Sequence, residues 1–215
     1  MHVVAFAAKK GGVGKTMLTA SMAVAAGNRR RSGRWAARRR VAIIDLDPQG
    51  CLTEWSNRRS GSTPALVETT LAELQRRLQA LAHAGTSLVL IDTPPGHESI
   101  LLQVLRVSDL IVIPIKPSEL DMAAALKTRR AAELTGARHI FLPNGAPYRS
   151  RAMGAAIRYL HLHGLPTLSP IHQRVGLMLE NGTTATERQP DSVGAQEVER
   201  AWRELDAILA EIRCD

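Results

Sequence analysis

A glycine-rich stretch near the start of the chain constrains the fold more than any other feature. Residues 9–16 read KKGGVGKT, after a short apolar run at residues 3–8 and before a helix-like segment at residues 16–26. Between a strand and a helix, such glycines let successive backbone N–H groups and the helix N-terminus face phosphate oxygens. The sequence therefore predicts a phosphate-binding loop (P-loop) in an α/β fold.

Short apolar runs alternate with helix-like segments along the rest of the chain. The expected strands are residues 2–8, 41–45, 87–91, 109–115 and 138–142, and the later expected helices are 71–81, 122–134, 152–163 and 198–212. This alternation is typical of βαβ units, so we expect an α/β fold with a mostly parallel twisted sheet and helices on both faces. With 215 residues, 45% of them hydrophobic, the chain can bury one sizeable core. We expect a single domain, residues 1–215, with an arginine-rich insertion at about residues 28–40.

The last two residues of the glycine-rich stretch predict the chemistry of the loop. Lys15 is expected to reach the β and γ phosphates of a nucleotide, and the Thr16 hydroxyl is expected to ligate Mg²⁺. The cofactors predicted from this loop are therefore ATP or ADP with Mg²⁺. The expected nucleotide-contacting residues of the loop are Gly11, Gly12, Val13, Gly14, Lys15, Thr16 and Met17.

Three acidic residues follow apolar strands and complete the predicted site. Asp45 and Asp47 follow the run VAII, and Asp92 follows LVLI. Acidic groups there emerge at the carboxyl edge of a parallel sheet, where open α/β sheets bind ligands. Asp92 is the expected Mg²⁺ partner and Asp47 the expected group that orients an attacking water. Asp45 is either a further group near the metal or a cap at the strand end.

The charge of the chain favours an anionic partner. Its formal net charge is +8, and lysine occurs only at positions 9, 10, 15, 116 and 127, so most of the basic residues are arginines. Seven arginines surround Trp35 within residues 28–40, at the sheet end expected to lie opposite the P-loop. Two interpretations remain open: Arg29, Arg30 and Arg31 bind DNA phosphates, or the segment is a solvated loop.

Several other classes of protein are not favoured by the sequence. The two cysteines, Cys51 and Cys214, lie far apart without metal-ligand spacing, which fits a reducing cytoplasm. The N-terminus lacks the pattern of a signal peptide. No apolar run approaches the roughly 20 residues that span a bilayer, so no membrane association is expected.

Three motifs together resemble those of the ParA-type partition ATPases, in the deviant Walker A group that also contains MinD. These motifs are KGGVGKT at residues 10–16, DLDPQG at residues 45–50 and LIDTPP at residues 90–95. The strand end IPIKPS at residues 113–118 resembles the segment that usually follows them. The resemblance extends from residue 1 to about residue 213, is weaker in the last third, and fits the small subgroup without an N-terminal helix-turn-helix.

This resemblance implies a mechanism and a set of partners. ATP would drive a sandwich homodimer in which Lys10 reaches the nucleotide of the other subunit and acts in catalysis with Lys15 and Asp47. Asn144 would contact the adenine. The dimer would bind nonspecific DNA at the nucleoid in the cytoplasm, and a ParB-like centromere-binding or adaptor protein would stimulate hydrolysis. Basic residues of the C-terminal half are the expected DNA contacts, namely Arg149, Arg151, Arg158, Arg174 and Arg188.

The predicted function is thus an ATPase for plasmid or chromosome segregation, with two alternatives. A MinD-like membrane-associated ATPase would share the nucleotide site, but the acidic residues after position 197 disfavour binding to anionic lipid. A small-molecule ligase of the dethiobiotin-synthetase type could use a pocket near residues 93–96 and Lys116. The cysteine pattern does not match a nitrogenase iron protein, and no terminal tyrosine cluster suggests a tyrosine kinase.

Overall fold

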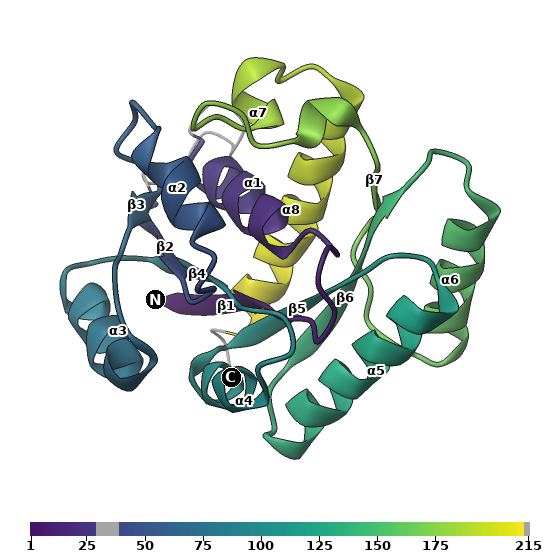
Figure 1. The fold of residues 1–215 in the computed structure, drawn as a ribbon, viewed down its shortest axis with the longest axis horizontal. Coiled ribbons are helices and arrows are strands. Elements are labelled where there is room, and N and C mark those ends of the chain that lie inside the picture. Colours follow the sequence, from purple (N-terminus) through teal and green to yellow (C-terminus); the bar gives the residue numbers. More distant parts are fainter. Residues whose placement is uncertain (29–38, 213–215) are drawn as a thin grey trace.

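The computed structural model describes residues 1–28 and 39–212 of the chain. Within these residues, seven parallel strands form one sheet in the order β3-β2-β4-β1-β5-β6-β7 (Figure 1). The strands are β1 (His2–Phe6), β2 (Val41–Asp45), β3 (Ala65–Leu66), β4 (Leu88–Asp92), β5 (Leu110–Ile115), β6 (His139–Ala146) and β7 (Ile171–His172). The predicted α/β fold with helices on both faces is confirmed.

The register of the central strands aligns their carboxyl ends at one edge of the sheet. Phe6 at the end of β1 pairs with Asp92 at the end of β4, and Asp92 also pairs with Asp45 at the end of β2. On its other side, β1 pairs with β5. The strands β2 to β4 therefore lie on one side of β1, and β5 to β7 lie on the other. The strand order reverses at β1, and ligands of open α/β sheets bind at such a point.

In the part of the chain that the structure describes, four α-helices cover each face of the sheet. One face carries α1 (Lys15–Gly27), α2 (Cys51–Asn57), α7 (Ala185–Arg188) and α8 (Val193–Ile212), and the other carries α3 (Leu74–His83), α4 (Glu98–Val107), α5 (Glu119–Leu134) and α6 (Arg151–Leu162). Among the described residues, no helix has both the length and the apolar character needed to cross a membrane.

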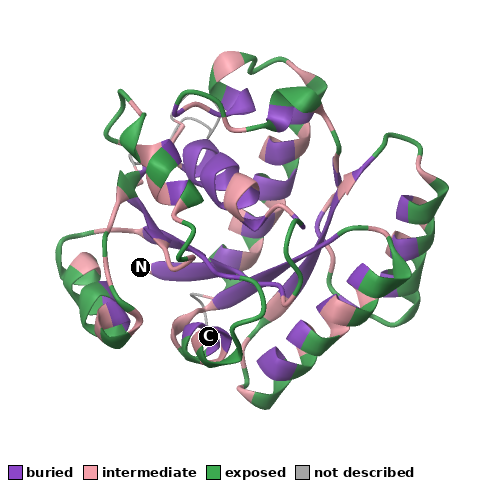
Figure 2. Ribbon diagram, in the orientation of Figure 1, coloured by how far each residue is buried: buried purple, intermediate pink, exposed green. Residues whose placement is uncertain are grey.

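Alternate residues of the central strands point into two separate hydrophobic cores, one on each face of the sheet. Val4 and Phe6 of β1 point into the cluster under α1 and α8, whereas Val3 and Ala5 point into the cluster under α4 and α5. Buried segments lie between the helices and the sheet on both sides (Figure 2). Because both faces are covered, the central strands read as continuous apolar runs.

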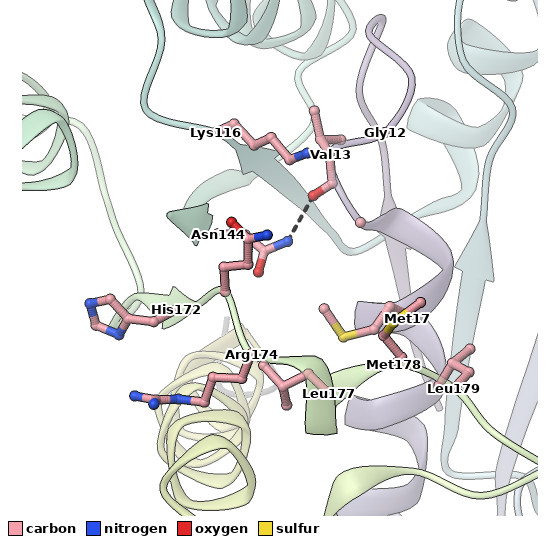
Figure 3. Close-up of a pocket in the computed structure, with 13 residues that line it drawn as sticks. Gly12, Val13, Met17, Lys116, Asn144, His172, Arg174, Leu177, Met178 and Leu179 are labelled. Atoms are coloured by element: carbon pink, nitrogen blue, oxygen red, sulfur yellow. Dashed lines mark hydrogen bonds between the residues drawn. The ribbon is translucent and has the colours of Figure 1, made fainter. Parts of the chain in front are cut away.

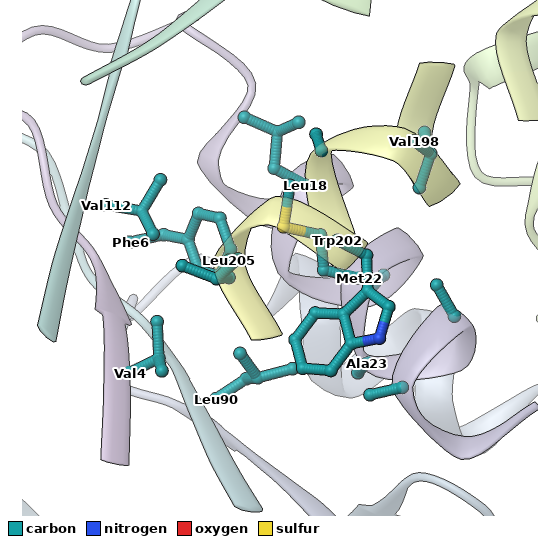
Figure 4. Packing of buried hydrophobic residues seen from close by; sticks show 14 of the residues in the cluster. Val4, Phe6, Leu18, Met22, Ala23, Leu90, Val112, Val198, Trp202 and Leu205 are labelled. Carbon is teal, nitrogen blue, oxygen red and sulfur yellow. The ribbon is translucent and has the colours of Figure 1, made fainter. Parts of the chain in front are cut away.

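The first core depends on the packing of α8 over α1. Figure 4 shows Leu18 and Met22 of α1 beside Trp202 and Leu205 of α8. Val198, Leu205 and Leu209 of α8 are almost completely buried, so the apolar stripe of this helix faces the core.

The sequence patterns predicted most of the strands and helices, but not all of them. The predicted helix at residues 122–134 begins earlier, at Glu119, because the Ser118 side chain accepts a hydrogen bond from the Asp121 amide. The helices α2 and α4 and the two-residue strands β3 and β7 were not predicted. Each of these strands is defined by pairing with a neighbour and has no periodic pattern of its own.

Residues 29–38 of the arginine-rich insertion lie outside the described residues, and with them Arg29, Arg30 and Arg31. The two arginines after them contact the protein. Arg39 forms an ion pair with Asp206 of α8 and lies over the ring of Trp202, 5.7 Å from its centroid. Arg40 donates to the carbonyl of Ala84, just after α3.

Truncating the α8 stripe should destabilise the whole domain. Leu205→Ala removes a fully buried side chain between α8 and the sheet, and we expect a loss of about 2–5 kcal/mol in the free energy of unfolding. Leu162→Ala on α6 is the matched control, since Leu162 is 84% exposed and should change stability by less than about 0.5 kcal/mol. Urea unfolding measures both, and equal effects would contradict this packing.

Candidate nucleotide-binding site

The P-loop joins β1 to α1 with its backbone open to a ligand. Gly12 and Gly14 have φ of 72° and 93°, values that favour glycine. Gly14 is also the N-cap of α1, and no side chain caps this helix. The first N–H groups of α1 are therefore available to phosphate oxygens, as the motif predicts.

Asn144 fixes the P-loop from the neighbouring strand β6. Its side-chain amide donates to the carbonyl of Val13 at 2.8 Å and is buried. A Cβ on Gly14 would lie only 2.5 Å from the Asn144 amide nitrogen, so only glycine fits there. Asn144 lies inside β6, since the strand is longer than predicted.

A cavity of about 410 Å³ opens from the P-loop between α1, β6 and the segment after β7 (Figure 3). Gly12, Val13, Gly14, Met17, Lys116, Asn144 and Gly145 line one part of it, and His172, Gln173, Arg174, Leu177, Met178 and Leu179 line the other. The cavity has an apolar end, at Met17 and residues 177–179, and a polar end at the P-loop. It therefore has the size and polarity for a nucleoside joined to phosphates.

The predicted Mg²⁺ partners Thr16 and Asp92 are in contact. The Thr16 hydroxyl donates to Asp92 Oδ2 at 2.6 Å, and Asp92 is completely buried at the end of β4. Within the described residues, Asp92 Oδ1 is buried without a hydrogen-bond partner. A buried carboxylate oxygen of this kind fits a water bound to Mg²⁺, which keeps several waters when it binds proteins.

Burial dominates the electrostatics of this edge of the sheet. It raises the pKa of Asp92 to about 7, although the Thr16 hydrogen bond and the Lys15 charge oppose the shift. Burial also lowers the pKa of the Lys15 ammonium, against the attraction of Asp92 and Asp47. The three predicted residues Lys15, Asp47 and Asp92 therefore lie within electrostatic reach of one another.

Asp45 and Asp47 have different surroundings although they are two residues apart. Asp45 accepts from the amides of Asp47 and Thr53 and from the Thr53 hydroxyl, so it joins β2 to the first turn of α2. This geometry favours the strand-end cap over the predicted role near Mg²⁺. Among the described residues, the Asp47 carboxylate accepts only from the local amide of Gln49, at 3.0 Å, and Asp47 is partly exposed, as a group that orients water requires.

Lys10 is not among the residues that line the cavity next to its own P-loop. Its ammonium lies 2.7 Å from Asp121 Oδ1 at the start of α5, and 43% of the Lys10 side chain is exposed. Burial disfavours ionisation of Asp121, but hydrogen bonds from Lys10 and Ser118 outweigh burial and lower its pKa. The pairing of Lys10 with Asp121 has no sequence signal, because the two residues lie more than 100 positions apart in the chain.

The segment from Arg174 to Arg188 connects the cavity to α2. On one side its residues 177–179 form the apolar wall of the cavity. On the other, the 5%-exposed side chain of Arg59 donates to the carbonyl of Gly182 and forms an ion pair with Glu187. The same guanidinium lies 4.6 Å from the centroid of the Trp55 ring on α2. No sequence pattern predicts this connection, because its partners lie more than 120 residues apart.

The predicted DNA-contacting arginines fall into two groups. Arg149, Arg151 and Arg158 are exposed, and Arg151 and Arg158 lie seven residues apart on one face of α6. Arg174 is held by Glu197, and Arg188 donates to the carbonyls of Gly176, Met178 and Thr183. The last two arginines therefore stabilise the cavity wall. Within the described residues the first three form no ion pair, and the Arg149 guanidinium lies 5.4 Å from the centroid of the Tyr148 ring.

A protein-family model described as the CobQ/CobB/MinD/ParA nucleotide binding domain matches residues 4–203. The chain is 32% identical to the Maintenance of carboxysome distribution protein A of Gloeobacter kilaueensis, over 94% of this chain and 96% of that protein. It is 30% identical to the Chromosome-partitioning ATPase Soj of Thermus thermophilus, over 53% of this chain and 54% of Soj.

The fold is also similar to that of a solved relative. The structure of apo McdA from Cyanothece superposes with a TM-score of 0.77, covering 97% of this chain and 99% of that one. The two sequences are 17% identical, so this likeness concerns the fold alone.

The raised pKa of Asp92 predicts a pH-dependent stability in the absence of Mg²⁺ and nucleotide. Asp92 releases its proton near pH 7 in the folded protein, against an ordinary pKa of 3.8. Between these values the folded state holds a proton that the unfolded chain has lost, so the free energy of unfolding falls as pH rises. Asp92→Asn lacks this component. In urea unfolding, the free energy of unfolding of the variant minus that of the wild type should increase from about pH 5 to about pH 7 and stay constant above pH 7. A difference that does not change with pH would contradict the raised pKa of Asp92.

Proposed function

The chain belongs to the CobQ/CobB/MinD/ParA nucleotide-binding family and is a P-loop ATPase, and we propose that it segregates or positions a large cargo on the nucleoid. In this proposal ATP binding drives homodimerisation and nonspecific DNA binding. A partner protein on the cargo stimulates hydrolysis, which returns the dimer to monomers and releases the DNA.

The observation that carries this proposal is the placement of Lys10. The two lysines of the P-loop differ in their surroundings: Lys15 is buried, whereas the Lys10 side chain is 43% exposed and pairs with Asp121 at the start of α5. Two triphosphates brought together at a dimer interface concentrate negative charge, and a cation supplied by the opposite subunit offsets it. Lys10 is therefore placed to make dimerisation depend on ATP.

The other residues of the site fit slow hydrolysis. Lys15, buried beneath the P-loop, would contact the phosphates, and Asp47, partly exposed, would orient the attacking water. Thr16 and Asp92 would hold Mg²⁺, which when bound stabilises the charge that develops on the phosphates. Lys10 would add to this stabilisation only in the dimer, so turnover would follow assembly.

The cargo is proposed from the relatives and not from the site. The relative from Gloeobacter kilaueensis, which matches almost the whole chain, is named for carboxysome distribution, and the Soj protein is named for chromosome partitioning. A large protein assembly is therefore proposed as the cargo, with a plasmid or chromosome as the second candidate. The stimulating partner would be an adaptor bound to that cargo, in the role of the ParB-like protein.

The membrane-associated alternative is disfavoured by α8. The apolar stripe of this helix is buried against α1 and the sheet, and three of its acidic residues bind other parts of the protein. Glu197 binds Arg174 and His172, Glu204 binds Ser169, and Asp206 binds Arg39. Within residues 193–212, therefore, no apolar face is available to lipid.

The ligase alternative is disfavoured because the residues expected to line its pocket do not share one: Lys116 lines the cavity of about 410 Å³ and is not among the residues that line the pocket beside residues 93–98. The pocket beside residues 93–98 has a volume of about 10 Å³, which is enough for about one water molecule. A small carboxylate substrate does not fit there.

Removing Lys10 should separate nucleotide binding from dimerisation. We expect Lys10→Ala to bind ATP within about threefold of the wild type and to form no ATP-dependent dimer in light scattering. Lys9→Ala is the matched control, because Lys9 forms an exposed ion pair with Glu98 and should leave dimers intact. Asp121→Asn, which frees Lys10, should also dimerise. ATP-dependent dimers of Lys10→Ala would refute the role of this lysine.

DNA binding should depend on ATP and on the exposed arginines of α6. We expect Asp47→Ala to stay on DNA after ATP addition, since hydrolysis would be lost. In that background, replacing Arg151 and Arg158 with alanine should reduce the slope of log affinity against log salt by about 0.9 for each lost phosphate contact. Arg77→Ala, on α3 at the other end of the sheet, is the control. Equal DNA binding with ATP, ADP and no nucleotide would refute the proposed function.

A further inference from the structure

Lys116 is a basic residue of the cavity to which neither the P-loop motif nor the proposed hydrolysis gives a role. It follows β5 directly and lines the cavity together with Gly12, Val13 and Asn144. Among the described residues, its ammonium forms no hydrogen bond or ion pair. Arg174, the other cation of the cavity wall, is already bound to Glu197. Lys116 thus has no direct polar partner within the described part of the chain, although its charge lies close enough to Asp121 to contribute to the lowered pKa of that carboxylate.

The stem of Lys116 is held in place by Gly145. A Cβ on Gly145 would lie 3.2 Å from Cε, 3.6 Å from Cγ and 3.9 Å from Cδ of Lys116. The lysine stem therefore lies along the backbone of β6, next to Asn144, where any larger residue would displace it. Gly145 also has a φ of 76°, so the position favours glycine for two reasons.

The ammonium of Lys116 lies at the P-loop end of the cavity. Figure 3 shows the side chain extending toward Val13, on the side of the cavity that the P-loop forms. The base of a nucleotide would occupy the apolar end, near Met17 and residues 177–179, and its phosphates would follow the P-loop into α1. The ribose and the first phosphate must then bridge these ends, beside the Lys116 ammonium.

We propose that Lys116 binds the ribose and α-phosphate of the nucleotide, with its stem packed on Gly145. The inference rests on the nucleotide site of the proposed function and deepens it, because it assigns recognition of the shared part of ATP and ADP to a residue outside the P-loop. Lys10 and Lys15 would respond to the β and γ phosphates, whereas Lys116 would retain the nucleotide whichever state it is in. A charge-assisted contact of this kind strengthens binding without regard to hydrolysis.

Calorimetric titration of ATP and of ADP, with Mg²⁺ and without DNA, tests the inference. Lys116→Met keeps most of the stem and removes the charge, so we expect it to weaken both nucleotides by about tenfold and by the same factor. The deficit should shrink at high salt, where the charge of the wild type is screened. Lys116→Ala should lose at least as much, and Lys127→Ala, an exposed lysine on α5, should bind both nucleotides as the wild type does.

Three results would overturn the assignment. They are unchanged affinity of Lys116→Met for both nucleotides, a loss confined to ATP, and a deficit that does not depend on salt. A loss confined to ATP would place the ammonium at the γ-phosphate or at a dimer interface. Because the titrations need neither dimers nor DNA, they report on Lys116 even if the proposed DNA binding fails, and failure at Lys116 leaves the DNA experiments unaffected.

Discussion

The parallel pairing of β1 with β4, and of β4 with β2, is the constraint on which the rest of the site depends. It places Phe6, Asp45 and Asp92 side by side at one edge of the sheet. The P-loop leaves that edge from β1, and the Thr16 hydroxyl reaches Asp92 across the gap between the strands. A slip of one residue would turn Asp92 to the other face of the sheet and separate it from Thr16.

Two buried carboxylates at this edge of the sheet, Asp92 and Asp121, each favour a positive charge beside them. Asp92 is held by one hydroxyl, and burial raises its pKa, so it favours the arrival of a cation. Asp121 has a lowered pKa because Lys10 and Ser118 bind it. In the proposed mechanism, releasing Lys10 would leave Asp121 with fewer partners, and this cost would oppose dimerisation until triphosphate compensated for it. In both cases a buried carboxylate is stabilised by a cation. The proposed Mg²⁺ would serve Asp92, and Lys10 pairs with Asp121.

The segment from Arg174 to Arg188 joins the nucleotide cavity to the helix that follows Asp47. Arg188, which belongs to this segment, donates to two of the segment's own carbonyls. Trp55 in α2 and Arg59 just after α2 donate to two further carbonyls of the segment. Gly182 permits this close approach, since a Cβ there would lie 2.5 Å from the backbone of Arg58. Arg174 and Arg188, which were predicted to contact DNA, therefore belong to the framework of the cavity.

The sequence alone determined the fold class and the main chemistry, because glycine spacing, apolar runs and strand-end acids are local patterns. Lys15, Thr16, Asp47 and Asp92 could be chosen in this way, and the structure brings them to one edge of the sheet. Only the tertiary structure decided the pairing of Lys10 with Asp121, the capping role of Asp45 and the position of Lys116 on Gly145. These contacts join elements through space, and no periodicity or motif records which side chains a folded sheet edge brings together.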